Sequence, residues 1–82
     1  MSAGRDKDGA ETRLDLRGLK CPLPALFAKR ALERAAPGME IEVLADDPMA
    51  KIDVPHMCRQ EGYDVVSQDD DATGSRFVLR KP

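Results

Sequence analysis

The sequence is poor in aromatic residues, cysteine and histidine. Its 82 residues include no tryptophan, one tyrosine, two phenylalanines, two cysteines and one histidine. A core must therefore consist mainly of aliphatic side chains. The cysteines and the histidine lack the paired spacing of a zinc site, so we expect no bound metal. No apolar run approaches the roughly 20 residues of a membrane-spanning helix, and the first residues carry no secretory signal pattern. We expect a cytoplasmic protein without a structural disulfide.

An excess of charge of one sign is also lacking. Thirteen lysines and arginines stand against 15 aspartates and glutamates, which gives a net charge of −2. Domains that bind nucleic acid directly are usually basic, so this balance argues against such a ligand. The chain has no glycine-rich phosphate loop and no dinucleotide fingerprint, and we expect no cofactor. Hydrophobic residues at 41% and charged residues at 34% are typical of one folded domain.

Apolar periodicity divides the chain into a tail and one domain. Residues 1–12 are polar and aperiodic, and we interpret them as a mobile N-terminal tail before a single domain at residues 13–82. Alternating patterns predict strands, and Ala/Leu/Lys/Arg/Glu-rich segments with proline and glycine boundaries predict helices. The predicted strands are 13–17, 39–45, 63–68 and 76–80, and the predicted helices are 22–36 and 48–61.

This β-α-β-α-β-β order predicts the architecture. Helices that alternate with strands favour an α/β two-layer sandwich, with two helices packed on one face of a four-stranded mixed sheet. The other sheet face would be solvated or used for self-association, which predicts a monomer or a weak homodimer.

Single residues refine these elements. Pro55 lies inside the second helix and predicts a break near Asp53. Asp47 and Pro48 fit the cap and the first position of that helix. The polar segment 69–75 is expected to be the loop of a hairpin, with its aspartates in solvent.

Cys21 stands where the first predicted strand meets the first predicted helix. Pro22 fits the first helical position, which places Cys21 at the cap. There the unpaired backbone amides, together with Lys20 and Arg17, are expected to lower the pKa of the thiol. Pro22 and Pro24 lack N–H groups that could hold the sulfur, so the lowering should be moderate. We predict an exposed, reactive thiol, against the alternative of a small buried side chain.

The helix at 22–36 has apolar residues on two faces. One stripe of mostly small residues is suited to packing on the sheet: Ala25, Ala28, Ala31, Leu32 and Ala35. The opposite side carries apolar and basic residues close to Cys21: Leu23, Leu26, Phe27, Arg30 and Arg34. Isolated apolar surface residues need no explanation. Their position beside Cys21 nevertheless favours a docking patch for a protein partner with an acidic rim.

The remaining candidates have simpler interpretations. Cys58 has no second cysteine two or three residues away, and we expect it to be packed or partly exposed in the second helix rather than to act as a catalytic or resolving thiol. His56 could pair with Cys21 only if the fold brings them together. Asp46 and Asp47 are explained by helix capping and charge at a helix start.

Six short motifs follow one another along the chain: Leu14-Asp15, Gly18 to Pro24, Pro37-Gly38, Ala45 to Pro48, Asp53 to Pro55 with Cys58, and Arg80-Lys81. With this set the chain resembles the TusA (SirA-like) sulfur carrier family over about residues 14–81. The resemblance implies the β-α-β-α-β-β sandwich. It also implies that the motif cysteine, here Cys21, carries sulfane sulfur as a persulfide, with Gly18, Lys20, Pro22 and Pro24 as the surrounding motif.

The resemblance further implies partners. Such carriers receive sulfur from a cysteine desulfurase or a similar donor and pass it to an acceptor protein. They serve tRNA 2-thiouridine synthesis, molybdenum cofactor maturation or sulfur oxidation, and act as sulfurtransferase-type carriers rather than enzymes with independent turnover. Leu23 occupies the variable motif position, where tRNA-thiolation members can carry an acidic residue, so the pathway stays open.

Two other functions remain open at this stage. One is a non-catalytic regulatory or adaptor domain that binds a protein partner through the surface around Leu23, Leu26 and Phe27. The other is a thiol–disulfide protein that uses Cys21 and Cys58. The distant spacing of the two cysteines favours the sulfur carrier over the redox protein.

Overall fold

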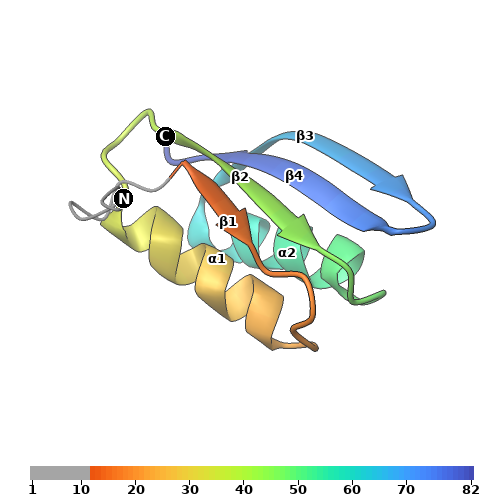
Figure 1. The fold of residues 1–82 in the computed structure, drawn as a ribbon. Coiled ribbons are helices and arrows are strands. Elements are labelled where there is room, and N and C mark those ends of the chain that lie inside the picture. The colour runs from red at the N-terminus through yellow and green to blue at the C-terminus, as the bar shows by residue number, and fades with distance from the viewer. Residues whose placement is uncertain (1–11) are drawn as a thin grey trace, which may run out of the picture.

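The four strands form one mixed sheet in the order β1-β2-β4-β3 (Figure 1). The structure is a computed structural model and describes residues 12–82, so all but the last residue of the predicted tail lies outside it. β1 runs parallel to β2, and β4 runs antiparallel to both β2 and β3. In chain order the elements are β1 (Arg13–Asp15), α1 (Leu23–Arg34), β2 (Glu40–Ala45), α2 (Ala50–Glu61), β3 (Asp64–Asp71) and β4 (Gly74–Arg80).

Both helices cover one face of the sheet, which confirms the predicted two-layer sandwich (Figure 1). Neither helix in residues 12–82 has the length and the apolar character that crossing a membrane requires. β2 alternates as predicted, with Ile41, Val43 and Ala45 buried on the helix side. The predicted stripe of α1 also faces the sheet, because Ala28, Leu32 and Ala35 are buried there and Ala25 and Ala31 pack at its margin.

The core between the layers is aliphatic except for Phe77. That side chain is fully buried on β4 and is the largest of the fully buried side chains. Leu79 lies beside it on the same strand, and α2 adds Val54, Met57 and Cys58 from the opposite layer. The predicted aliphatic core is therefore confirmed, with one aromatic ring at its centre.

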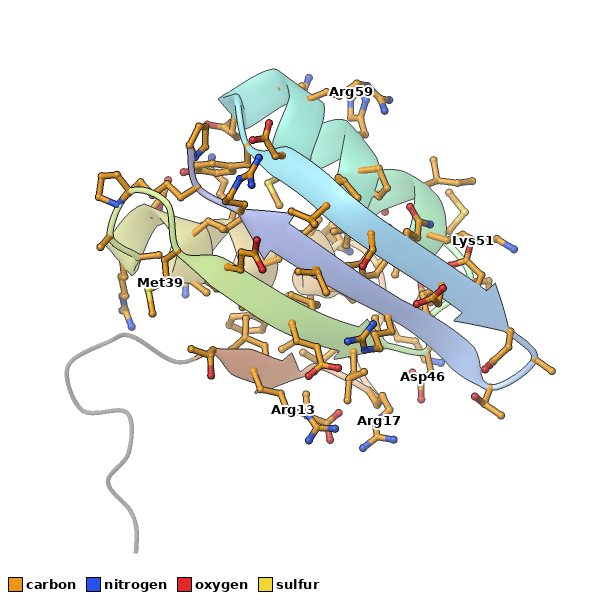
Figure 2. The ribbon with its side chains drawn as sticks, turned by 90° about the horizontal axis from the view of Figure 1, so that it is seen from above. Arg13, Arg17, Met39, Asp46, Lys51 and Arg59 are labelled. Carbon is orange, nitrogen blue, oxygen red and sulfur yellow. The ribbon has the colours of Figure 1, made fainter. Side chains whose placement is uncertain are left out.

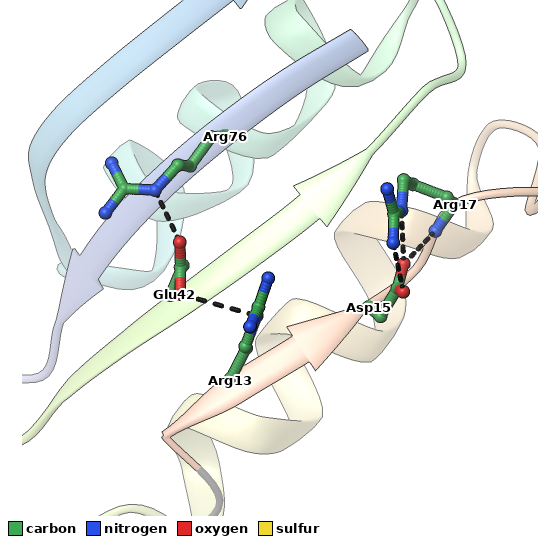
Figure 3. Close-up of polar contacts among 5 residues, drawn as sticks. All are labelled: Arg13, Asp15, Arg17, Glu42 and Arg76. Carbon is green, nitrogen blue, oxygen red and sulfur yellow. Dashed lines mark hydrogen bonds and ion pairs between the residues drawn. The ribbon is translucent and has the colours of Figure 1, made fainter. Parts of the chain in front are cut away.

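The open face of the sheet carries charged side chains that pair across strands (Figure 3). Glu42 on β2 forms ion pairs with Arg13 on β1, at 3.6 Å, and with Arg76 on β4. Arg76 also reaches Asp69 on β3 at 3.4 Å. Exposed pairs of this kind contribute only about 0–1 kcal/mol each. They balance charge on this face, and its use in self-association stays a prediction.

The predicted break at Pro55 is wrong, because α2 runs unbroken from Ala50 to Glu61. Pro55 has no N–H to donate to the carbonyl of Lys51, four residues earlier. That carbonyl instead accepts a hydrogen bond of 3.2 Å from Nε2 of Gln68 on β3. Gln68 lies opposite Phe77 in the sheet register, and its side chain reaches α2. A side chain of the edge strand thus replaces the hydrogen bond that proline removes.

The starts of both helices also differ from the prediction. α1 begins at Leu23, so Pro22 is its cap residue and Pro24 its second residue. α2 begins at Ala50 with Met49 as its cap residue. Asp47 still acts at this helix start, because its carboxylate accepts a hydrogen bond of 3.1 Å from the backbone N–H of Met49. Neither predicted cap residue, Cys21 or Asp47, is the cap residue of its helix, and each helix start is shifted by one turn or less.

The hairpin is longer than predicted. β3 continues to Asp71 and β4 begins at Gly74, which leaves only residues 72–73 between the strands. The carboxylate of Asp71 accepts hydrogen bonds from the backbone N–H of Thr73, at 2.7 Å, and from its hydroxyl, at 2.6 Å. These bonds close the turn. The aspartates at 69–71 therefore lie in a strand, although they are exposed as predicted.

Candidate functional site

The site is built where the parallel strands β1 and β2 end. The carboxyl ends of parallel strands lie at the same edge of a sheet, so the segments that follow them meet. Figure 2 shows Arg17 and Asp46 side by side at this end. The backbone N–H of Gly18 donates a hydrogen bond of 2.9 Å to Oδ1 of Asp46. Gly18 has a φ of 91°, a left-handed conformation that favours glycine, and the motif glycine thus forms the turn before Cys21.

Cys21 is exposed in the loop between β1 and α1, as predicted. It does not cap the helix, because Pro22 is the cap residue and forms no side-chain cap hydrogen bond. The first helical amide, that of Leu23, donates to the carbonyl of Lys20 at 2.8 Å, and Pro24 has no N–H. The start of α1 therefore has few free backbone N–H groups that could donate a hydrogen bond to the sulfur. This is the physical reason why the capping prediction fails.

The thiol of Cys21 instead donates a hydrogen bond to Oδ2 of Asp53, with a sulfur–oxygen distance of 2.7 Å. Asp53 lies in the first turn of α2 and is half-buried. The pKa of Cys21 is raised, first by this hydrogen bond, then by desolvation, and then by the negative charges of Asp53 and Asp47. The predicted lowering of the pKa is wrong. Cys21 is an exposed thiol that its surroundings keep protonated.

The two basic residues that precede Cys21, Arg17 and Lys20, do not offset this effect. The guanidinium of Arg17 donates two hydrogen bonds to the carboxylate of Asp15, at 2.8 Å and 2.7 Å, and its backbone N–H donates a third at 3.2 Å (Figure 3). These bonds hold the pKa of Asp15 at about 2. Lys20 is exposed, and no ion pair within residues 12–82 includes it. Arg17 is therefore paired with Asp15 at the end of β1, and its positive charge does not act on the sulfur.

The predicted docking patch is only partly exposed. Leu23 and Leu26 are 37% and 39% exposed. Phe27 packs at the margin of the core, with the guanidinium of Arg30 over its ring at 5.8 Å from the centroid. Arg34 is exposed in the last turn of α1, at the end away from Cys21. Leu23 and Leu26 therefore remain the apolar residues of α1 that a partner can reach beside the thiol.

A second helix contributes apolar residues that sequence reasoning missed. Met49 and Ile52 are 45% and 56% exposed, and both stand next to Asp53 at the start of α2. We call Leu23, Leu26, Met49 and Ile52 the apolar rim, since they are the large exposed apolar residues within five positions of Cys21 or Asp53 in the chain. The sequence offered a weak signal, because Met49 and Ile52 are apolar residues on a helix with a polar outer face. The hydrogen bond between Cys21 and Asp53 brings the start of α2 to the thiol, and no local pattern predicts that contact.

Cys58 and His56 take no part in this arrangement. Cys58 is fully buried in α2 rather than partly exposed, and both cysteines are free thiols. Burial, with a smaller effect of Asp64, raises the pKa of Cys58 to about 11. His56 is exposed, and the hydrogen bond of Cys21 goes to Asp53 instead. No group of three or more metal-ligating side chains occurs among residues 12–82.

The burial of Cys58 predicts a loss of stability at alkaline pH. Because the folded protein holds this proton more tightly than the unfolded chain, the stabilisation is complete below about pH 9 and is lost as the pH rises towards about 11. The loss is expected to be roughly 2–3 kcal/mol. Urea unfolding across this window should show a smaller decline for Cys58→Ala than for the wild type. Parallel declines would contradict this assignment.

The family model described as Sulfurtransferase TusA matches residues 12–81. This chain belongs to the TusA family. The crystal structure of a SirA-like protein from Desulfitobacterium hafniense is also similar, with a TM-score of 0.67 and 28% sequence identity. That match covers 83% of this chain and 92% of the other. Membership in the TusA family supports a general role as a sulfur carrier that works with other proteins.

Proposed function

We propose that this TusA-family protein accepts sulfane sulfur as a persulfide on Cys21 and passes it to an acceptor protein. The observation that carries the proposal is the free thiol of Cys21, exposed in the loop before α1 of a chain from a sulfurtransferase family. Cys58 is buried and is not available to a second protein. Cys21 is therefore the residue to which the carrier role is assigned, with a cysteine desulfurase or a similar protein as donor.

The proposed transfer needs only thiol chemistry. The Cys21 thiol gives its proton to solvent, and the thiolate attacks the outer sulfur of the donor persulfide, so that a new S–S bond forms on Cys21 as the S–S bond of the donor breaks. The donor cysteine leaves as a thiolate and takes up a proton. Delivery repeats this exchange with a thiol of the acceptor. Neither step is a net oxidation or reduction, and neither uses a cofactor or a metal.

The apolar rim supports protein partners on both sides of this exchange. An exposed thiol, together with the exposed side chains of the apolar rim, suits a partner that excludes water around the reacting sulfurs. We propose that the final acceptor belongs to tRNA thiolation, molybdenum cofactor maturation or sulfur metabolism. We also propose that residues 13–82 act in the cytoplasm as a single-domain monomer or weak homodimer.

A second candidate is a regulatory or adaptor domain in which the thiol has no role. The exposure of Leu23 and Leu26 favours this function independently of Cys21, because both side chains are available to a partner. The two candidates differ in one respect. An adaptor keeps its full cellular function when Cys21 is replaced by alanine, and a sulfur carrier loses it.

Sulfur loading tests the first candidate directly. The protein is incubated with a cysteine desulfurase and cysteine, and its intact mass is measured before and after reduction. The wild type and the control variant Cys58→Ala are expected to gain one reducible sulfur atom, and Cys21→Ser to gain none. If the wild type gains no sulfur, or if Cys21→Ser gains as much as the wild type, the proposal fails.

A further inference from the structure

We propose that Asp53 keeps Cys21 protonated and unreactive in the free carrier, and that a basic side chain of the donor protein releases it. We call this arrangement the Asp53 lock. The inference rests on the proposed function and adds to it a regulated state of the same thiol and a chemical requirement for the partner. Its starting point is the 2.7 Å hydrogen bond from the Cys21 thiol to Oδ2 of Asp53.

The charged groups around Cys21 are mostly acidic. From α2 the sulfur meets Asp53, and from the segment between β2 and α2 it experiences the negative charge of Asp47. Asp46 lies in the same segment and holds the Cys21 loop through Gly18. On the loop itself, Arg17 is bound to Asp15, which leaves Lys20 as its other basic residue.

This geometry stabilises the thiol and not the thiolate. A carboxylate only accepts hydrogen bonds, so the bond to Asp53 exists only while the sulfur carries its proton. Loss of that proton would break the bond and place two negative charges in contact. Since oxidation and alkylation act on the thiolate, the lock protects an otherwise exposed cysteine from both.

A cation at Asp53 would release the lock. Within residues 12–82 no lysine or arginine forms an ion pair with Asp53 or Asp47, so both carboxylates are available to an incoming charge. An arginine or lysine that binds Asp53 takes the place of the thiol as its hydrogen-bond donor and brings a positive charge close to the sulfur. Both changes favour the thiolate.

The apolar rim would strengthen this exchange. Met49 and Ile52 adjoin Asp53, and a partner that covers them removes water from the ion pair. The expected donor surface therefore has a basic side chain bordered by apolar residues. In the docked state Cys21 gives its proton to solvent, and the thiolate attacks the outer sulfur of the donor persulfide. The donor S–S bond breaks, and the departing thiolate takes up a proton from water.

Alkylation of Cys21 tests the locked state. The fully folded protein is treated with iodoacetamide across a range of pH, and the modified cysteine is identified by mass. At pH 7 the rate for Asp53→Asn is expected to be about three to ten times that of the wild type. The matched control Asp69→Asn removes a carboxylate on the open sheet face and should react as the wild type does. Equal rates for Asp53→Asn and the wild type would overturn the lock.

The wild type provides a second test that needs no variant. The pH profile of its alkylation should give a higher apparent pKa than that of N-acetylcysteine measured under the same conditions. A profile at or below that of the free thiol would contradict the lock even if Asp53→Asn failed to fold. Circular dichroism of each variant identifies loss of folding directly.

Loading with two kinds of donor tests the release. With glutathione persulfide, which carries no protein surface, Asp53→Asn is expected to load several-fold faster than the wild type. With a cysteine desulfurase it is expected to load several-fold more slowly, because the basic partner of Asp53 has lost its target. A change in the same direction with both donors would overturn the release step. If neither the wild type nor Asp53→Asn gains sulfur from either donor, the proposed function itself fails. If both load normally and their alkylation rates are equal, only the lock is rejected.

Discussion

Phe77→Ala is expected to lower the free energy of unfolding by about 3–5 kcal/mol. Phe77 is fully buried on β4 and lies opposite Val43 on β2 and Gln68 on β3 in the sheet register. The substitution removes the one aromatic ring from a core of aliphatic side chains. Strands pair on both sides of β4, so the backbone around the cavity cannot readily collapse into it. The loss is large beside the roughly 5–15 kcal/mol that stabilises a whole domain.

The chain contains a matched control for this substitution. Phe27 is the second phenylalanine, and it packs only at the margin of the core. Phe27→Ala should therefore lower the free energy of unfolding by only about 1–2 kcal/mol. Only part of the ring is buried, and its removal leaves little cavity. Equilibrium unfolding in urea, followed by circular dichroism, measures both values. Similar losses for the two variants would show that the core is not centred on Phe77.

Gly74→Ala is expected to lower the free energy of unfolding by about 3–4 kcal/mol. Gly74 has a φ of 146°, which side chains rarely adopt. A Cβ at this position would also lie 2.4 Å from the carbonyl oxygen of Ala45 and 3.1 Å from Cα of Asp46. Both atoms belong to backbone, so the strand end must move to make room.

Gly62→Ala separates the two causes. Gly62 ends α2 with a φ of 82°, and a Cβ there meets no heavy atom within 4 Å. Its replacement should cost about 1 kcal/mol, which is the conformational part alone. The difference between the two variants in urea unfolding measures the overlap at Gly74. Because Asp46 holds Gly18, the Gly74 variant should also alter the loop that carries Cys21. Equal stabilities of the two variants would contradict the overlap.

The order of the elements could be predicted from the sequence because its signals are local. Alternation in residues 40–45, the alanine stripe of α1 and Gly62 after α2 each depend on neighbouring residues. Pro55 misled the prediction for the opposite reason. Proline breaks a helix when the freed carbonyl finds no partner, and here the partner is Gln68, which lies 17 residues from Lys51. The strands of the hairpin were predicted too short, because three successive aspartates are uncommon in strands.

The same distinction explains the site. Exposure of Cys21 followed from its place between two elements and was predicted correctly. Its electrostatics were predicted from the nearest residues, Arg17, Lys20 and the start of α1. The structure instead directs Arg17 to Asp15 and brings Asp53 to the sulfur from 32 residues away. No local pattern reports such a contact, although the topology does, because the segments after two parallel strands meet at one sheet edge.

The two hydrogen bonds around Cys21 also determine when the site can form during protein synthesis. They join residues 28 and 32 positions apart, so neither can form until the later segment has been made. At about 5–20 residues per second, Asp53 is added roughly two to six seconds after Cys21. Throughout this interval Cys21 lacks the hydrogen-bond partner that it has in the folded protein. The bond can form only when α2, which carries Asp53, has been made and has packed against the sheet.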